Sequence, residues 1–479
     1  MSKHHGLKEL PGLGAYCTGD DHAEQREDRF GRMFPDLPPN YVAGDLLVQL
    51  GRAGGPMDGG TSSTRTNSVP VGHVMFGQFI DHDITLDVTS SLSRNQHASD
   101  TPNVRTPTLD LDCIYGDGPE AHPYLYDDGV KLLTGADSNG ATVEQSNDLL
   151  RSPNGRAMIG DPRNDENRIV SQLQLGIIRF HNAMCDTIAA EPEGHTGGEL
   201  FEEARHRVTW HYQWAVVFDF LGAMCGRPVV DDILANGRRI YCMTDRPFIP
   251  VEFSVAAYRF GHSMVPMKIQ VQKGGALFEF FGGVLGRGFT AVSDTRAIVD
   301  WHELFDTSAG RTVQRADRLD TSMASDLLDL PFVDDLSESS LATRNLLRGN
   351  VFRLPSGEQV ARQLEIDAAE VRPVTDLVRS LADQGVAGND VAPLTTGSPL
   401  WLYILAEAEV IGRAKPGGTT EPGEGLGPVG ARIVAEVLIG LLEMDERSFL
   451  GANRNWVPDP AFGTIGEILA STNWDGLPT

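Results

Sequence analysis

The chain has 479 residues, of which 41% are hydrophobic and 22% are charged, a balance typical of a globular protein with a large buried core. Lysine and arginine number 40 against 66 aspartates and glutamates, so the formal net charge is −26, which argues against nucleic acid and anionic membranes as partners. The five cysteines form no C-x-x-C pair, which excludes a thiolate zinc site of that kind and favours free thiols.

Domain organisation and location are expected to be simple. No apolar run reaches the roughly 18 to 20 residues of a membrane span, and the start of the chain has no stretch of signal-peptide type. We therefore expect a protein that is cytoplasmic or exported without a standard signal and that has no membrane partner. For the oligomeric state, a monomer is favoured. Because no repeat or interdomain linker is visible, we expect an N-terminal arm, residues 1–25, and one large domain, residues 26–479.

The first segment with chemical character is residues 76–85, in which an apolar helical pattern contains three consecutive ionisable residues, Asp81, His82 and Asp83. Successive side chains on a helix diverge by about 100°, so these three cannot converge on one small ligand. Gln78 and His82 are four residues apart and share a face. The segment could be a solvated turn, or it could be a functional site whose three ionisable side chains act in three different directions.

A second segment places oxygen-bearing residues at alternate positions, with apolar residues between them. These are Thr106, Thr108, Asp110 and Asp112. An extended chain would turn all four to one side, which suits calcium, a cation that takes six to eight oxygen ligands. The EF-hand spacing is absent, and a solvent-facing edge strand is the alternative.

Residues 160–167 precede a long predicted helix that begins near Arg168. Apolar residues recur at spacings of three and four from Val170 to Ile188, which predicts one buried helical stripe. Arg163 and Glu166 lie three residues apart just before this helix, where they could form an ion pair, a cap or part of a site.

Further helices are predicted by the same periodicity at residues 201–224, 399–411 and 433–442. Patterns with the strand period of two are scarce. The sequence therefore predicts a mainly α architecture with long connecting loops.

His262 follows Gly261 within the mostly apolar residues 257–266. An axial metal ligand and a packed core histidine would both fit this setting.

Taken in order, these segments resemble the animal-type haem peroxidases of the peroxidase-cyclooxygenase superfamily, from about Pro70 to about Leu450. The resemblance is supported by LATRNLLRG at residues 341–349, LPSG at 354–357 and LGPVGARIVAE at 426–436. It implies a single large haem-peroxidase domain with helices around a buried haem.

The resemblance also implies catalytic residues. His82 would be the distal histidine that accepts and returns a proton of hydrogen peroxide, Arg163 would stabilise charge on the O–O bond, and Gln78 would lie beside them. His262 would be the proximal ligand of the haem iron, with Asn345 as its hydrogen-bond partner.

Two cofactors are implied in the same way. Asp81 and Glu166 would join a haem b by ester bonds, and Arg259 and Arg348 would lie near its propionates. Calcium would be held by five residues, namely Asp83, Thr106, Thr108 through its carbonyl, Asp110 and Asp112.

The implied function is oxidation of small anions (bromide, iodide, thiocyanate) or phenolic donors by hydrogen peroxide. Myeloperoxidase-like relatives have a methionine after the ester glutamate that forms a third haem bond, and here that position is Asn167. We therefore expect little chloride oxidation. Many relatives have the sequence Arg-Asp-His-Gly where this chain has Asn-Val-Phe-Arg at residues 350–353.

Two other functions are considered. A fatty-acid dioxygenase of the same superfamily would need a tyrosine three residues before His262, where this chain has Arg259. Tyr258 is one residue away and is expected to face another direction. A calcium-stabilised adhesion or scaffold protein without turnover is the non-enzymatic alternative, although it would not need His82, Arg163 and His262.

Overall fold

Helices dominate the computed structural model, which describes residues 30–478 except residues 62–63, 88–95, 193, 242–246 and 331–338. The expected N-terminal arm, residues 1–25, lies outside the described residues, as do Cys17 and Cys242. The other three cysteines, Cys113, Cys185 and Cys225, are buried free thiols.

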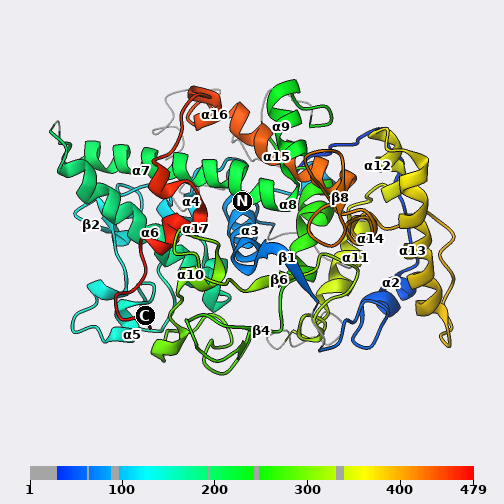
Figure 1. Cartoon of the computed structure of the whole chain (residues 1–479), viewed down its shortest axis with the longest axis horizontal. Helices are drawn as coiled ribbons and strands as arrows, with labels where there is room; N and C mark the ends of the chain where they lie inside the picture. Colours follow the sequence, from blue (N-terminus) through cyan, green and yellow to red (C-terminus); the bar gives the residue numbers. More distant parts are fainter. Residues whose placement is uncertain are drawn as a thin grey trace, which may run out of the picture.

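The helices fall into a longer and a shorter set, and Figure 1 shows α3 and α8 near the middle of the molecule and α13 at its right-hand edge. The long ones are α3 (Val71–Ile84), α6 (Arg168–Ala189), α7 (Gly197–Trp214), α13 (Ala368–Val386), α14 (Leu400–Val410), α11 (Leu341–Val351) and α15 (Pro428–Met444). The shorter ones are α2 (Gly44–Gly51), α4 (Asp112–Tyr115), α5 (Val143–Ser146), α8 (Leu221–Met224), α9 (Arg227–Asn236), α10 (Trp301–Leu304), α12 (Gly357–Gln363), α16 (Phe449–Ala452) and α17 (Ile465–Ala470).

Strands among the described residues form four small antiparallel pairs. They are β1 (Arg65–Pro70) with β6 (Arg315–Asp317), β2 (Tyr126–Asp127) with β3 (Lys131–Leu132), β4 (Lys268–Ile269) with β5 (Phe278–Glu279), and β7 (Arg413–Ala414) with β8 (Thr420–Glu421). The prediction of a mainly α fold is confirmed.

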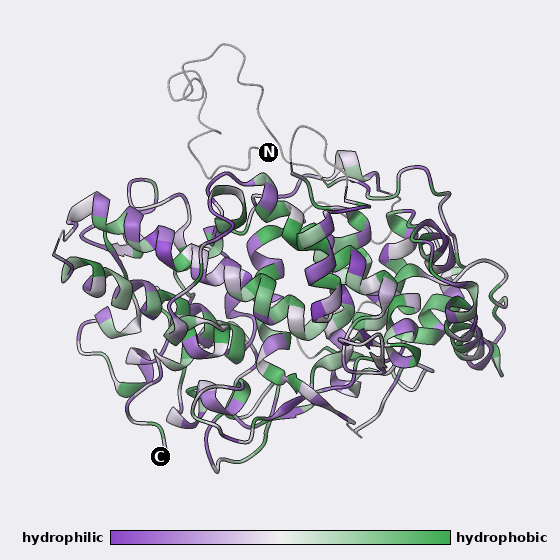
Figure 2. Ribbon diagram, turned by 45° about the horizontal axis from the view of Figure 1, so that its top comes forward, coloured by the Kyte–Doolittle hydropathy of each residue, from purple (hydrophilic) through white to green (hydrophobic). Residues whose placement is uncertain are grey.

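The core lies where apolar helices cross. Helix α15 is buried along nearly its whole length, as expected of a helix surrounded by protein, and it packs against α14. Figure 2 shows that the helices in the middle of the molecule carry the most hydrophobic residues. The predicted stripe of α6 is buried from Val170 to Ile188, and the helix begins where Asn167 accepts a hydrogen bond from the Val170 amide at 3.0 Å.

Two departures from the regular α-helix occur next to the central helices. Helix α7 continues through a π-helical turn at residues 215–220 into α8, and a second π-helical turn at residues 252–256 leads into a 3₁₀ helix, Ala257–Met264. Such π turns are often found at functional sites. The 3₁₀ helix carries His262 and contacts α3, which carries His82. None of the described helices is both long and apolar enough to cross a membrane.

Candidate functional site

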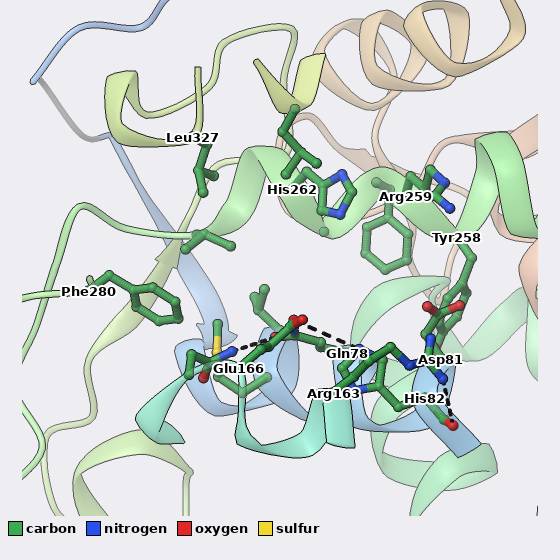
Figure 3. Close-up of a pocket in the computed structure, with 18 of the residues that line it drawn as sticks. Gln78, Asp81, His82, Arg163, Glu166, Tyr258, Arg259, His262, Phe280 and Leu327 are labelled. Atoms are coloured by element: carbon green, nitrogen blue, oxygen red, sulfur yellow. Dashed lines mark hydrogen bonds and ion pairs between the residues drawn. The ribbon is translucent and has the colours of Figure 1, made fainter. Parts of the chain in front are cut away.

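A cavity of about 380 Å³ lies between two parts of the chain. On one side are α3 and the short 3₁₀ helix Pro162–Asp165, and on the other side is the 3₁₀ helix Ala257–Met264. Figure 3 shows His262 and Arg259 on one side of this cavity, and Gln78, His82, Arg163 and Glu166 on the other. Phe280 and Leu327 close one end. Segments far apart in the sequence thus supply one site.

His82 is buried on α3 with its two ring nitrogens in different surroundings. Its Nδ1 lies 2.7 Å from Asn164 Oδ1, and its Nε2 lies 3.9 Å from Glu166 Oε1 at the cavity. Burial and the charge of Arg163 lower the pKa of His82 to about 4, so the ring is neutral near neutral pH. A neutral imidazole is able to accept a proton.

Arg163 is held by Asp161 and by carbonyl groups at the end of α3. Its Nη2 donates to Asp161 Oδ2 at 2.7 Å and to the carbonyl oxygens of His82 at 3.1 Å and Thr85 at 2.5 Å. Although burial raises the pKa of Asp161, the hydrogen bond and charge of Arg163 lower it to about 2. The guanidinium therefore lines the cavity with its charge partly balanced by a buried carboxylate.

Glu166 and Gln78 contact one another across the cavity floor. The Gln78 Nε2 donates to Glu166 Oε1, and Asn167 Nδ2 donates to Gln78 Oε1 at 3.1 Å. Burial raises the pKa of Glu166 to about 7. Asp81 also lines the cavity, and its Oδ1 accepts a hydrogen bond from Thr85 Oγ1 at 2.9 Å.

His262 lies across the cavity from these residues. Its Nδ1 is 2.8 Å from Asn345 Nδ2, while Asn345 Oδ1 is buried and has no partner among the described residues. Turning this amide by about 180° would let Oδ1 accept from an Nδ1 proton. Burial and the charge of Arg259 lower the pKa of His262 to about 3, so its Nε2 is available as a ligand atom.

Two arginines lie on the His262 side. Arg259 lines the cavity and donates to the Ser254 carbonyl at 2.9 Å, and its pKa falls to about 10, chiefly through burial. Among the described residues that line the cavity, Arg344 is present, whereas Arg348, one turn later on α11, is not. Arg348 Nη1 lies 3.8 Å from Asp87 Oδ2. Sequence reasoning missed Arg344, although it stands inside the segment 341–349.

Tyr258 also lines the cavity, which corrects the expectation that it faces another direction. Neighbouring side chains of a 3₁₀ helix diverge by about 120°, so the cavity extends around this turn far enough to meet both Tyr258 and Arg259. The Tyr258 ring stacks on Phe253 at 4.6 Å, and its hydroxyl is buried with no partner among the described residues.

Behind α3, Asp83, Asp110 and Asp112 converge, with one carboxylate oxygen from each within 4.8 Å of the others. Thr106 Oγ1 donates to Asp110 Oδ1 at 3.3 Å. Burial raises the pKa of all three carboxyl groups. Asp83 Oδ1, Asp112 Oδ1 and Thr108 Oγ1 are buried without a partner in the described part of the chain. Unpaired buried oxygens around one point fit a hard cation.

The loop reaches this arrangement differently from the expected extended chain. Leu111 has φ 60°, in the left-handed region, and Asp112 begins α4, so residues 106–112 are not a strand. Leu109 and Leu111 are nevertheless fully buried between the less buried oxygen-bearing residues. The alternation of the sequence is thus kept as burial, while the turn at Leu111 brings Asp110 and Asp112 towards Asp83.

Comparison with known sequences identifies a family model and several relatives that match this chain. A sequence model of the family described as animal haem peroxidase matches residues 89–385. Dual oxidase 1 of Caenorhabditis elegans is 27% identical over 220 residues, which cover 44% of this chain and 14% of that protein. A peroxidase-like protein of Margaritifera margaritifera is 26% identical over 244 residues, covering 40% of this chain and 31% of that protein. These matches therefore span less than a third of either relative.

Solved structures resemble the whole fold. Peroxidase A from Dictyostelium discoideum has a TM-score of 0.61 at 15% identity, covering 94% of this chain and 92% of that chain. A fatty acid alpha-dioxygenase of Oryza sativa has the same TM-score at 16% identity, covering 94% and 79%. These identities show a shared fold. Because the family match covers more than half of the sequence, this chain belongs to the animal haem peroxidase family.

Proposed function

We propose that this chain holds a haem between His82 and His262 and catalyses the oxidation of small anions or phenols by hydrogen peroxide. The observation that carries the proposal is that these two histidines face one cavity from opposite sides (Figure 3). Each of them also contacts an asparagine. The bound iron would supply the redox chemistry. A cavity with many apolar lining residues and two arginines on its His262 side, Arg259 and Arg344, fits a planar apolar group that carries carboxylates.

His262 would hold the iron through Nε2, because Nδ1 is already in contact with Asn345. Metal-binding histidines usually bind the metal through one ring nitrogen and make a hydrogen bond through the other. Arg259 would face the propionates. Arg348 remains a prediction for the same role, and Arg344 is added to it.

His82 would move the proton. Its neutral ring is able to take a proton from one peroxide oxygen and return it to the other, and Arg163 would stabilise the negative charge that develops between these steps. Gln78 would keep Glu166 in place by the hydrogen bond between them.

Ester bonds from Asp81 and Glu166 to the haem are a further part of the proposal. Both carboxyl groups line the cavity, and the raised pKa of Glu166 means that it holds a proton for part of the time near neutral pH. Mass spectrometry of denatured protein after peroxide treatment tests this proposal. Recovery of all haem as the free, unmodified molecule would refute it.

Calcium would occupy the cluster of Asp83, Asp110 and Asp112, with Thr106 and Thr108 as additional ligands. Three carboxylates buried together repel one another when ionised, and Arg105, whose Nη1 lies 3.3 Å from Asp112 Oδ2, is close to only one of them. The unpaired oxygens support a bound cation. The ion would fix the end of α3, on which His82 lies directly before Asp83.

The central test is haem retention by the His262→Ala variant. We expect the purified protein to show haem absorbance and to oxidise iodide and a phenol with peroxide, and His262→Ala to lose either the haem or the turnover. His195→Ala, which changes a partly exposed histidine in an ion pair with Glu199, is the matched control. An unchanged haem spectrum and full activity in His262→Ala would refute the proposal.

One observation favours a second function, fatty-acid oxidation. Tyr258 lines the cavity, its hydroxyl has no partner among the described residues, and three of the similar solved structures are fatty acid alpha-dioxygenases. Arg259, however, stands at the position expected for the tyrosine of such enzymes. Oxygen uptake with palmitate that is lost in Tyr258→Phe would favour this second function over the first.

A further inference from the structure

Three consecutive side-chain hydrogen bonds lead from His82 into the protein, away from the cavity. His82 Nδ1 lies 2.7 Å from Asn164 Oδ1, Asn164 Nδ2 donates to Gln174 Oε1 at 2.8 Å, and Gln174 Nε2 donates to the Cys113 carbonyl at 3.1 Å. Asn164 and Gln174 are fully buried, and His82 is 4% exposed. We call Asn164 and Gln174 the amide relay.

The direction of the amide relay is determined at its far end. A backbone carbonyl only accepts hydrogen bonds, so the NH₂ end of Gln174 must face Cys113 and its oxygen must face Asn164. The NH₂ end of Asn164 must then face Gln174, and its oxygen must face His82. Since an amide oxygen also only accepts, Nδ1 of His82 has to carry a proton.

This direction decides what His82 presents to the cavity. A neutral imidazole carries one proton, so a proton on Nδ1 leaves a lone pair on Nε2. Glu166 would favour the opposite arrangement, but its Oε1 is 3.9 Å from Nε2, beyond hydrogen-bond distance. The shorter contact, at 2.7 Å to Asn164, therefore prevails.

We propose that Asn164 and Gln174 are positioning residues that hold His82 in the tautomer with its lone pair on the cavity-facing Nε2. The importance of this tautomer for peroxide rests on the proposed function, whereas the tautomer itself can be measured without turnover. The amide relay ends on the residue after Asp112, so it also joins the distal histidine to the loop of the carboxylate cluster.

The tautomer is tested by nuclear magnetic resonance on protein with ¹⁵N-labelled histidine rings. The spectrum is recorded on the diamagnetic carbon monoxide complex of the ferrous protein, or on the protein as purified if it carries no haem, and His82→Gln assigns the signal. We expect a proton on Nδ1 in the wild type. Asn164→Leu, which removes the acceptor, should lose this preference.

Three further variants separate the relay from general packing. Asn164→Asp keeps an acceptor for Nδ1, so Nδ1 should stay protonated, although the carboxylate cannot donate to Gln174 Oε1 as Asn164 does. Gln172→Leu is the matched control, because Gln172 lies on the same helix and bonds both the Asn147 carbonyl and the Val299 amide, away from His82. Gln174→Leu should weaken the preference that Gln172→Leu leaves intact.

The rate of reaction with peroxide provides the functional readout. Outer residues that orient a catalytic group typically contribute a factor of about 10 to 100, and we expect a loss of this size in Asn164→Leu but not in Gln172→Leu. A wild-type tautomer and rate in Asn164→Leu would overturn the proposal. So would an Asn164→Asp variant that loses the proton on Nδ1. A wild type without haem or peroxide reaction would instead refute the proposed function and leave the resonance result to judge the relay.

Discussion

His82 concentrates most of the proposed chemistry in one side chain, and its environment supports proton transfer rather than a fixed charge. Burial keeps the ring neutral, and Asn164 contacts Nδ1, which leaves Nε2 towards the cavity. Gln78 lies one turn away on the same face of α3, as its spacing predicts.

We predict that His82→Ala retains haem but reacts with peroxide about 10² to 10⁴ times more slowly, the usual contribution of a positioned proton-transfer residue. Stopped-flow absorbance measures the rate, and His195→Ala is the control. Wild-type rates in His82→Ala would show that another group moves the proton.

Asn167 leads to a prediction about electron donors. Its amide is engaged at both ends, accepting from the Val170 amide and donating to Gln78, and an amide cannot form the sulfonium bond of a methionine. We predict turnover of bromide, iodide and thiocyanate with little turnover of chloride near neutral pH. Halogenation assays at matched concentrations decide this, and chloride turnover as fast as bromide turnover would contradict the prediction.

At the level of elements, the sequence predicts what is local and misses what depends on long-range folding. The helical period predicts that Gln78 and His82, four residues apart, share one face of α3. It also predicts that Asp83, directly after His82, points in a different direction. The left-handed turn at Leu111 has no such signal, since no glycine marks it. The roles of Asn164 and Gln174 also could not be predicted, because an amide takes its direction from a partner elsewhere in the chain, here Cys113.

The loop of residues 106–112 leads to a prediction about calcium and pH. Burial raises the pKa of Asp83, Asp110 and Asp112 above the ordinary value of 3.8, so without a cation the folded protein binds more protons than the unfolded chain. The free energy of unfolding of the calcium-free protein should then fall as the pH rises above about 4. Calcium binds the ionised carboxylates and offsets this loss.

We therefore expect calcium to raise the Tm, and to raise it more near neutral pH than near about pH 5, where protons compete for the carboxylates. Thermal unfolding with calcium or a chelator at the two pH values measures this. Asp110→Asn should reduce the calcium effect, whereas Asp294→Asn, which changes an aspartate paired with Arg296 outside the cluster, should not. Equal Tm values with and without calcium would contradict the prediction.

Over the whole molecule, the net charge of −26 acts on every charged donor that approaches the cavity. Like charges slow the encounter of an anion with the protein, and this effect is screened over about 8 Å at physiological ionic strength. Within the cavity, the charge of Arg163 is partly balanced by Asp161, so this arginine offers limited compensation.

We predict that an inert salt such as sodium sulfate accelerates the oxidation of iodide and thiocyanate, by up to about tenfold from low to moderate ionic strength. A neutral phenol is not repelled by the charge of the protein, so the rate of its oxidation by the same preparation should change little. The phenol therefore serves as the internal control. Sulfate is chosen because it adds no halide. If the rate with iodide instead falls as salt is added, the entrance to the cavity attracts anions, and the local field of its arginines outweighs the charge of the whole surface. Equal responses of iodide and the phenol would show that the encounter does not limit turnover, because an electrostatic effect on the approach must distinguish a charged donor from a neutral one.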